Sequence, residues 1–280
     1  MVPPRHTAIA QEEHHDGEDE EASSMTLLSV DIPFDQWLDY LFGRPVGPSG
    51  FRESDDWWDE QADPDRAVDY LTRLFEAPNV LLGRFPNDQI DRGLWFLAGE
   101  SGHLRPLLGP PVPWDVRRHG LLAIGGLYER LFARACTNHL GHIDRGPEPP
   151  DPLNSICYMW WDLFPTWGGH ADADADAQRP SDPARRRSGR HRGRTGAEAA
   201  GGTQAGSQQT VDEALLDVMA RTLRLDSEPC REGALHGLGH WHRAYPERTS
   251  DIIEAWLDEE PSISPELRRY ATSARGGCVL

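Results

Sequence analysis

The apolar positions of this chain recur at the spacing of α-helices. The clearest run is Ala234, Leu238, Trp241 and Tyr245, which recur at i, i+4, i+7 and i+11 and therefore form one continuous helical face. Few segments alternate between apolar and polar residues with a period of two, as half-buried strands would. The pattern therefore predicts an all-α protein.

Capping residues mark where several of these helices begin. Asp63 precedes Pro64, so a side-chain acceptor stands before a proline at the first helical position, and Ser264 precedes Pro265 in the same way. Asn87 is a candidate cap for a further helix. The pattern predicts helices over the ranges 67–75, 113–132, 154–163, 211–225 and 249–258, with others that carry residues 92–99 and 231–245 and one that begins at 264.

Three stretches, at 92–99, 118–132 and 231–245, share a pair of glycines six residues apart. The pairs are Gly93/Gly99, Gly120/Gly126 and Gly233/Gly239. A glycine inside a helix costs about 1 kcal/mol relative to alanine. We therefore interpret the recurrence as a requirement for close approach between neighbouring helices, with chance in a glycine-rich chain as the alternative.

The sequence REGALHGLGH at 231–240 resembles the second helix of a HEAT-type repeat, and the stretch 118–128 resembles the same helix. The resemblance is clearest over 211–260 and weaker over 113–132. It implies antiparallel helix pairs stacked as a short, irregular α-solenoid, a scaffold that is used mainly to bind proteins. The spacing of the three stretches is uneven, and the tryptophan-rich N-terminal third departs from the motif.

The composition divides the chain into four parts. Residues 1–24 are polar and acidic, which predicts a disordered tail, and 25–167 form the N-terminal part of the solenoid. Residues 168–210 are rich in Ala, Asp, Arg and Gly and contain no large apolar side chain, which predicts a disordered insertion or linker. Residues 211–280 form the C-terminal HEAT-like helices.

Charge and cysteine content exclude several functions. The net charge is −18, which argues against general nucleic-acid binding, although the arginine-rich segment 185–194 could bind an acidic partner or nucleic acid. The chain has no lysine, so it has neither a phosphate-binding-loop lysine nor a Schiff-base lysine. Its four cysteines are far apart in sequence, which favours reduced thiols. We expect a cytoplasmic protein with no membrane association and no cofactor.

The histidines of the stretch 231–245 are the first candidates for chemistry. His236 and His240 are four residues apart, so they share a helical face at a spacing that suits zinc, whereas His242 points to the opposite side. No carboxylate stands at a fixed offset to complete a ligand set. In the alternative interpretation, His236 and His240 are ordinary repeat positions, because Ala123 and Leu127 align with them.

A second group consists of His139 and His142, with Cys136 beside them. Their spacing of three would align them only on a continuous helix, which Asn138 and Gly141 interrupt. The metalloprotease motif HExxH is absent. We therefore predict no bound metal and keep the two histidine groups as the only candidate ligands.

Tryptophan supplies the candidate partner-binding residues. Trp57–Trp58 and Trp160–Trp161 are adjacent pairs, and the two members of a pair cannot share one helical face. One member of each pair could therefore be exposed as a contact for a partner, and the alternative is that both belong to the core.

The sequence predicts a non-enzymatic protein-interaction module on a helical-repeat scaffold, with a protein as its partner. One role consistent with this prediction is the neutralisation or regulation of a cognate protein. The alternative is a metal-dependent enzyme that uses His236 and His240.

Overall fold

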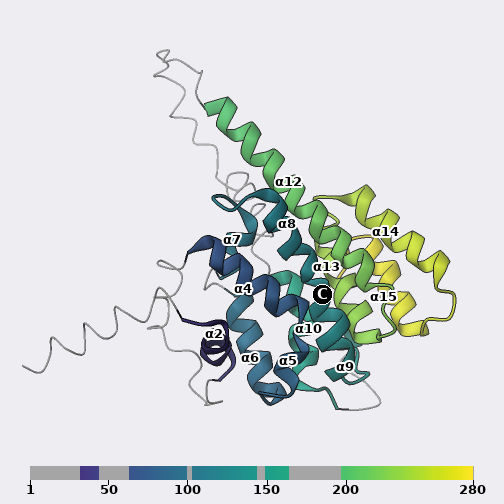
Figure 1. The fold of residues 1–280 in the computed structure, drawn as a ribbon. Coiled ribbons are helices and arrows are strands. Elements are labelled where there is room, and N and C mark those ends of the chain that lie inside the picture. The colour runs from purple at the N-terminus through teal and green to yellow at the C-terminus, as the bar shows by residue number, and fades with distance from the viewer. Residues whose placement is uncertain (1–31, 44–62, 100–102, 144–148, 164–196, 280) are drawn as a thin grey trace, which may run out of the picture.

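The computed structural model describes residues 32–43, 63–99, 103–143, 149–163 and 197–279, and the side chains of 197–209 are not included (Figure 1). Every regular element in these ranges is helical, so the prediction of an all-α protein is confirmed. The acidic tail at 1–24 and residues 168–196 of the expected linker lie outside them. Residues 197–210, which we also assigned to the linker, form the start of a long helix instead.

The N-terminal half contains helices that are each bounded by proline or glycine. They are α2 (Phe34–Phe42), α4 (Pro64–Glu76), α5 (Asn79–Leu82), α6 (Asn87–Ala98), α7 (Arg105–Leu108) and α8 (Trp114–Ala123). After α8 the helix continues as the π-helix η2 (Leu127–Phe132) and the short α9 (Ala133–Ala135), so the predicted helix 113–132 is interrupted.

The C-terminal half contains the longer helices. They follow a 3₁₀ turn, η3 (Gly141–Ile143), and are α10 (Pro152–Leu163), α12 (Ala197–Thr222), α13 (Glu228–Trp241), α14 (Pro246–Glu259) and α15 (Pro265–Arg275). Among the described residues, no helix is both long enough and apolar enough to cross a membrane.

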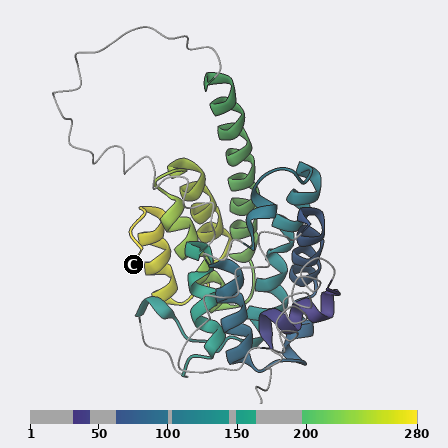
Figure 2. The ribbon, with the colours of Figure 1, turned by 90° about the vertical axis from the view of Figure 1, so that its left-hand side faces the viewer.

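The long helices stack in two rows (Figures 1 and 2). In one row α2, α6, α10, α13 and α15 each pack on the next, and in the other α4, α8, α12 and α14 do the same. Helix α13 also contacts α12 and α14, so it is enclosed by both rows. Of the three glycine-paired stretches, 92–99 and 231–245 lie mainly in the first row and 118–132 begins in the second. The resemblance to HEAT repeats stays a prediction.

Two of the three predicted caps are present. The Asp63 side chain accepts a hydrogen bond from the backbone of Asp65 at 3.2 Å, and Ser264 accepts one from Leu267 at 3.4 Å. Asn87 does not cap α6, because Pro86 occupies the cap position. The Asn87 amide instead donates to the carboxylate of Asp151, at the start of α10.

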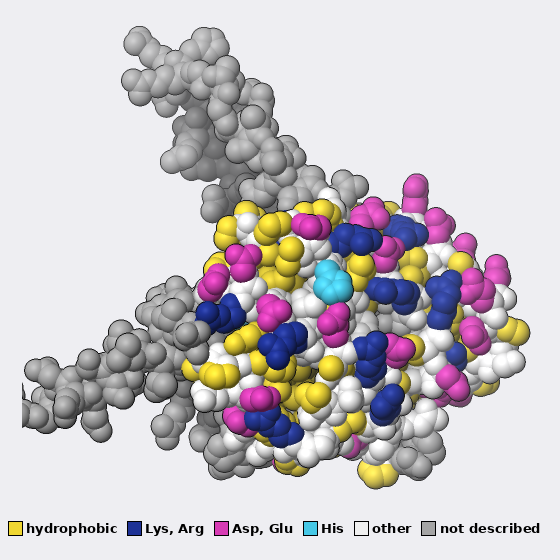
Figure 3. All heavy atoms as spheres, viewed as in Figure 1, with side chains coloured by type: hydrophobic (Ala, Val, Ile, Leu, Met, Phe, Trp, Pro, Cys, Tyr) yellow, Lys and Arg dark blue, Asp and Glu magenta, His cyan; other side chains and the backbone are white. Residues whose placement is uncertain are grey.

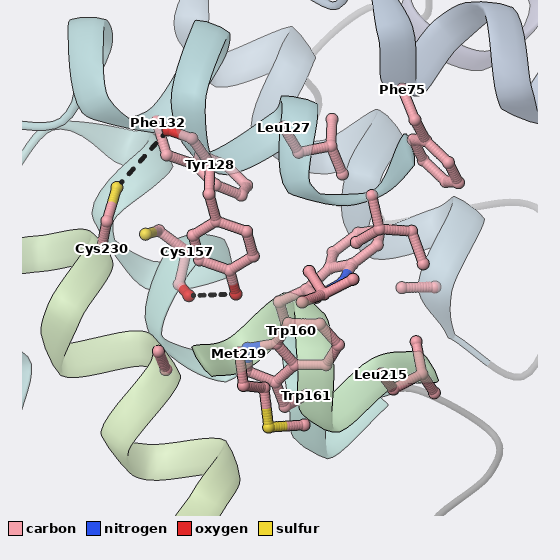
Figure 4. Close-up of a cluster of buried hydrophobic side chains, with 14 of the residues drawn as sticks. Phe75, Leu127, Tyr128, Phe132, Cys157, Trp160, Trp161, Leu215, Met219 and Cys230 are labelled. Carbon is pink, nitrogen blue, oxygen red and sulfur yellow. Dashed lines mark hydrogen bonds between the residues drawn. The ribbon is translucent and has the colours of Figure 1, made fainter. Parts of the chain in front are cut away.

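Trp160 and Trp161 both lie in the core (Figure 4). The ring of Trp161 stacks on Tyr128 with centroids 5.8 Å apart, and Trp160 meets the edge of Phe75 at 6.2 Å. Neither side chain is exposed, so of the two alternatives for this pair the structure shows the one in which both tryptophans belong to the core. The other pair, Trp57 and Trp58, lies outside the described residues.

Close approach explains most of the paired glycines. A Cβ atom on Gly233 would lie 2.5 Å from the backbone oxygen of Cys157, and one on Gly126 would lie 2.0 Å from that of Phe75. Only a residue without a side chain fits at such positions, since the interior is close-packed. Gly99 differs, because it ends α6 and lies near the backbone of its own helix.

The described surface carries charges of both signs, which are interspersed on the face shown in Figure 3. Exposed ion pairs such as Arg224–Glu259 at 2.9 Å and Arg248–Asp217 at 3.0 Å join α12 and the residues that follow it to α14. Exposed pairs of this kind contribute about 0–1 kcal/mol each. Apolar packing between the two rows therefore dominates the stability of the fold.

Candidate metal centre

Helix α13 is buried on nearly every side, yet it carries a stripe of polar residues. Glu232, His236 and His240 stand at i, i+4 and i+8, which places them on one face of the helix. Glu232 is 2 % exposed and His236 is 1 % exposed. Buried polar groups of this kind require partners, and the partners come from three other parts of the chain.

Asp162, at the C-terminal end of α10, faces the two histidines. Its Oδ2 atom lies 2.9 Å from His236 Nε2, and its Oδ1 atom lies 3.4 Å from His240 Nε2. The two imidazole Nε2 atoms are 3.2 Å apart. Oδ1 is buried and makes no hydrogen bond to any described residue. Three residues, each offering one potential ligand atom, thus converge on one point.

The other nitrogen of His236 faces a pair of tyrosines. Its Nδ1 atom lies 2.8 Å from the hydroxyl oxygen of Tyr270 in α15, and that oxygen lies 2.9 Å from the hydroxyl oxygen of Tyr158 in α10. The Tyr158 ring also packs on the His236 imidazole with centroids 4.1 Å apart. His236 is therefore fixed at both nitrogens and on one ring face.

Glu232 anchors the turn η3 to α13. Its carboxylate accepts hydrogen bonds at 2.8 Å from the backbone N–H groups of Gly141 and His142, and it also bonds Nδ1 of the His142 ring. The His142 ring stacks on Tyr270 with centroids 4.2 Å apart and planes inclined by 17°. Two histidine–carboxylate pairs, His236–Asp162 and His142–Glu232, therefore meet at Tyr270.

Burial governs the protonation of this cluster. Burial lowers the pKa of His240, and the neighbouring His236 lowers it further, while the Asp162 carboxylate raises it. Burial also raises the pKa of the Tyr270 phenol, as does its contact with Tyr158. Imidazole in its neutral form is the form that binds metals.

The candidate histidines are divided between this cluster and other places. His236 and His240 lie together, as their spacing predicts. His142 joins the cluster through Glu232 and Tyr270. His139 does not take part in these contacts, and its buried Nδ1 makes no hydrogen bond to any described residue. His242 turns away and bonds the hydroxyl of Thr249 in α14 at 3.2 Å.

Sequence reasoning missed Asp162, Tyr270 and Glu232. Asp162 is 74 residues from His236, and Tyr270 is 34 residues from it, so no local spacing connects them. One signal was present: Asp162 is an acid near the end of an otherwise apolar helix, and Glu232 is an acid in a helix that proves to be buried.

The thiols also come together in space. Cys157 and Cys230 are buried and form no disulfide. The Cys157 thiol contacts the backbone carbonyl of Pro229, and the Cys230 thiol contacts that of Tyr128. Burial raises the pKa of Cys157, and the nearby Cys136 and Cys230 thiols add to this. The Cys157 side chain is therefore an apolar packing group in its thiol form, which agrees with the expectation of reduced cysteines.

A cavity of about 410 Å³ lies apart from the cluster, between α8 and α12. Arg130 and Arg221 line it together with Glu76 and Glu129. Both arginines already donate to backbone carbonyl groups, those of Glu76 and Leu122. The mixed charges favour no single class of ligand, so the cluster at α13 is the better candidate site.

No protein-family model matches the chain, and no curated protein or solved structure shows significant similarity to it. The function is therefore inferred from the geometry of the site.

Proposed function

We propose that the protein binds one divalent transition-metal ion through Asp162, His236 and His240, and that it is a metal-dependent enzyme. The observation that carries this proposal is the mutual distance of the ligand atoms, which all lie within 4.8 Å of one another. Ligands of a tetrahedral ion at zinc bond lengths are about 3.3 Å apart. The two Nε2 atoms are 3.2 Å apart, and each lies near one Asp162 oxygen, His236 at 2.9 Å from Oδ2 and His240 at 3.4 Å from Oδ1, which are distances close to that spacing.

The exposure of the ligands supports a reactive metal over a purely structural one. His236 is 1 % exposed, whereas the side chains of His240 and Asp162 are 28 % and 21 % exposed. Three protein ligands with an accessible side resemble catalytic zinc sites, in which water or substrate takes the remaining position. Two imidazoles and one carboxylate also suit iron(II). A metal ion held by Asp162, His236 and His240 would activate a bound water molecule or polarise an oxygen atom of the substrate.

The competing explanation is a hydrogen-bonded cluster without a metal. In that arrangement His236 donates its Nε2–H to Asp162, and the His240 imidazole lies against both residues as part of the same cluster. The buried Oδ1 of Asp162, which accepts no hydrogen bond from a described residue, favours the metal, because a buried carboxylate oxygen requires a partner and a cation would supply one.

Metal analysis of the full chain separates the two explanations. Apoprotein prepared with a chelator is titrated with zinc, cobalt(II), manganese(II) and iron(II), and the bound metal is measured after gel filtration. We expect the apoprotein to bind one equivalent of zinc or iron(II). Bound cobalt(II) should show the d–d absorption of a coordination site of low symmetry. Zinc at 100 times its dissociation constant should raise the free energy of unfolding by about 2.7 kcal/mol.

Substitutions locate the ion. Asp162→Asn and His240→Ala should each abolish stoichiometric binding, whereas His242→Ala, a histidine of the same segment that faces α14, should retain it. Binding of less than a tenth of an equivalent of every metal by the wild-type chain would refute the proposal. Equal binding by all three variants would refute the ligand assignment.

The protein-interaction hypothesis rests on the resemblance to HEAT repeats and stays a prediction. Of its four candidate contact residues, Trp160 and Trp161 are buried and Trp57 and Trp58 lie outside the described residues.

A further inference from the structure

The hydroxyl of Tyr270 meets the one atom of His236 that the proposed metal site leaves free. His236 faces Asp162 and His240 through Nε2, and its Nδ1 lies 2.8 Å from the Tyr270 oxygen. A neutral imidazole carries one proton, so a His236 that binds an ion through Nε2 must carry its proton on Nδ1. That proton needs an acceptor, because His236 is 1 % exposed.

We propose that Tyr270 is a positioning residue for the metal site, whose hydroxyl stabilises the His236 tautomer that presents Nε2 to the ion. This inference rests on the proposed function. A hydroxyl group both donates and accepts hydrogen bonds. Tyr270 therefore satisfies His236 in the metal-free state by donating to Nδ1, and in the metal-bound state by accepting from Nδ1–H.

The number of protons on His236 is the same in the metal-free and metal-bound states. When the ion binds, one proton leaves Nε2 for solvent and one is taken up at Nδ1, so the imidazole stays neutral. The Tyr270 O–H rotates from Nδ1 to the hydroxyl oxygen of Tyr158, which lies 2.9 Å away and acts as the acceptor. No proton is transferred between the tyrosines.

Tyr270 is held in place independently of His236. Its ring stacks on His142 at 4.2 Å, and His142 is fixed by the carboxylate of Glu232. The Tyr270 side chain is 6 % exposed, so water does not readily replace its hydroxyl. Outer-shell hydrogen bonds to a ligand histidine orient the ring and fix its tautomer.

The test compares the zinc affinity of the full chain with that of Tyr270→Phe and of Tyr158→Phe, measured by competition with a chromophoric chelator. Tyr270→Phe leaves the Nδ1–H buried without its acceptor, so we expect zinc affinity about 10- to 100-fold weaker. Tyr158→Phe keeps the Tyr270–His236 bond and removes only the acceptor of the Tyr270 O–H, so we expect a smaller loss of zinc affinity than in Tyr270→Phe. Equal losses in both variants, or wild-type affinity in Tyr270→Phe, would overturn the inference.

Nitrogen-15 NMR of the wild-type chain gives a second readout, which holds even where Tyr270→Phe fails to fold. With zinc bound, His236 should show a slowly exchanging Nδ1–H with a cross-peak to the Tyr270 ring protons. A rapidly exchanging Nδ1–H would refute the role of Tyr270 and leave the metal site in place. A wild-type chain that binds no zinc, iron, cobalt or manganese would instead refute the proposed function itself.

Discussion

Replacing Gly233 with alanine tests the contact between α10 and α13 on which the candidate site depends. Gly233 faces the backbone of α10, and one turn later Gly237 faces Trp161 of the same helix. This contact sets the distance between the two helices, and α10 carries Asp162 while α13 carries His236. The substitution therefore acts on the site without removing any of its ligands.

Two opposing terms determine the magnitude. Alanine is favoured over glycine in a helix interior by about 1 kcal/mol. Against this, the new Cβ would lie 2.5 Å from the Cys157 backbone oxygen, so one helix must move. Overpacking of a close-packed core typically costs about 1–3 kcal/mol, and a backbone atom cannot rotate away as a side chain can. The upper end of that range should apply, with a net destabilisation of about 2 kcal/mol.

Chemical denaturation followed by tryptophan fluorescence measures this change. Gly125→Ala is the matched control, because Gly125 is also helical but a Cβ there meets only Val218, at an ordinary 3.8 Å. We expect the control to be stabilised by up to about 1 kcal/mol, while Gly233→Ala also loses zinc affinity. A Gly233→Ala protein as stable as the control would show that the close approach of α10 and α13 is not required.

Two further predictions concern charged side chains. Burial raises the pKa of Asp91 to about 6, although its hydrogen bond from Trp95 acts in the opposite direction. Because this folded-state pKa lies above the unfolded one, its stabilising contribution is complete at low pH and is lost as the pH rises through 6. The free energy of unfolding of wild type should therefore fall relative to Asp91→Asn between about pH 4 and 7, and a constant difference across that range would contradict this. Asp63→Ala removes the cap of α4 and should cost about 1 kcal/mol in the same denaturation assay, whereas an unchanged midpoint would exclude a capping role.

The helices follow from local sequence, and their packing does not. Helix α4 starts at Pro64 and α15 at Pro265, because the caps and prolines act within one turn. The interruption before η2 was not predicted; it lies where Gly126 packs against the backbone of Phe75 in α4, a contact between segments far apart in the sequence. The burial of Trp160 and Trp161 has the same origin, because both faces of α10 are covered by helices from distant parts of the chain.

Only half of the candidate site could be predicted, for a physical reason. His236 and His240 are one helical turn apart, so their proximity is a local property, whereas Asp162 reaches them only through the packing of α10 on α13. A buried stripe of one acid and two histidines is costly in an apolar core unless each group is bonded. The chain meets this requirement with Asp162, Tyr270 and the η3 turn, which come from three separate segments. Such convergence around the most enclosed helix is difficult to explain as packing alone, since alanine at 236 and leucine at 240, the residues of the aligned positions Ala123 and Leu127, would need none of these partners. The proposed cation would account for the buried carboxylate oxygen and the facing imidazole nitrogens together, and that is why metal analysis is the decisive measurement for this protein.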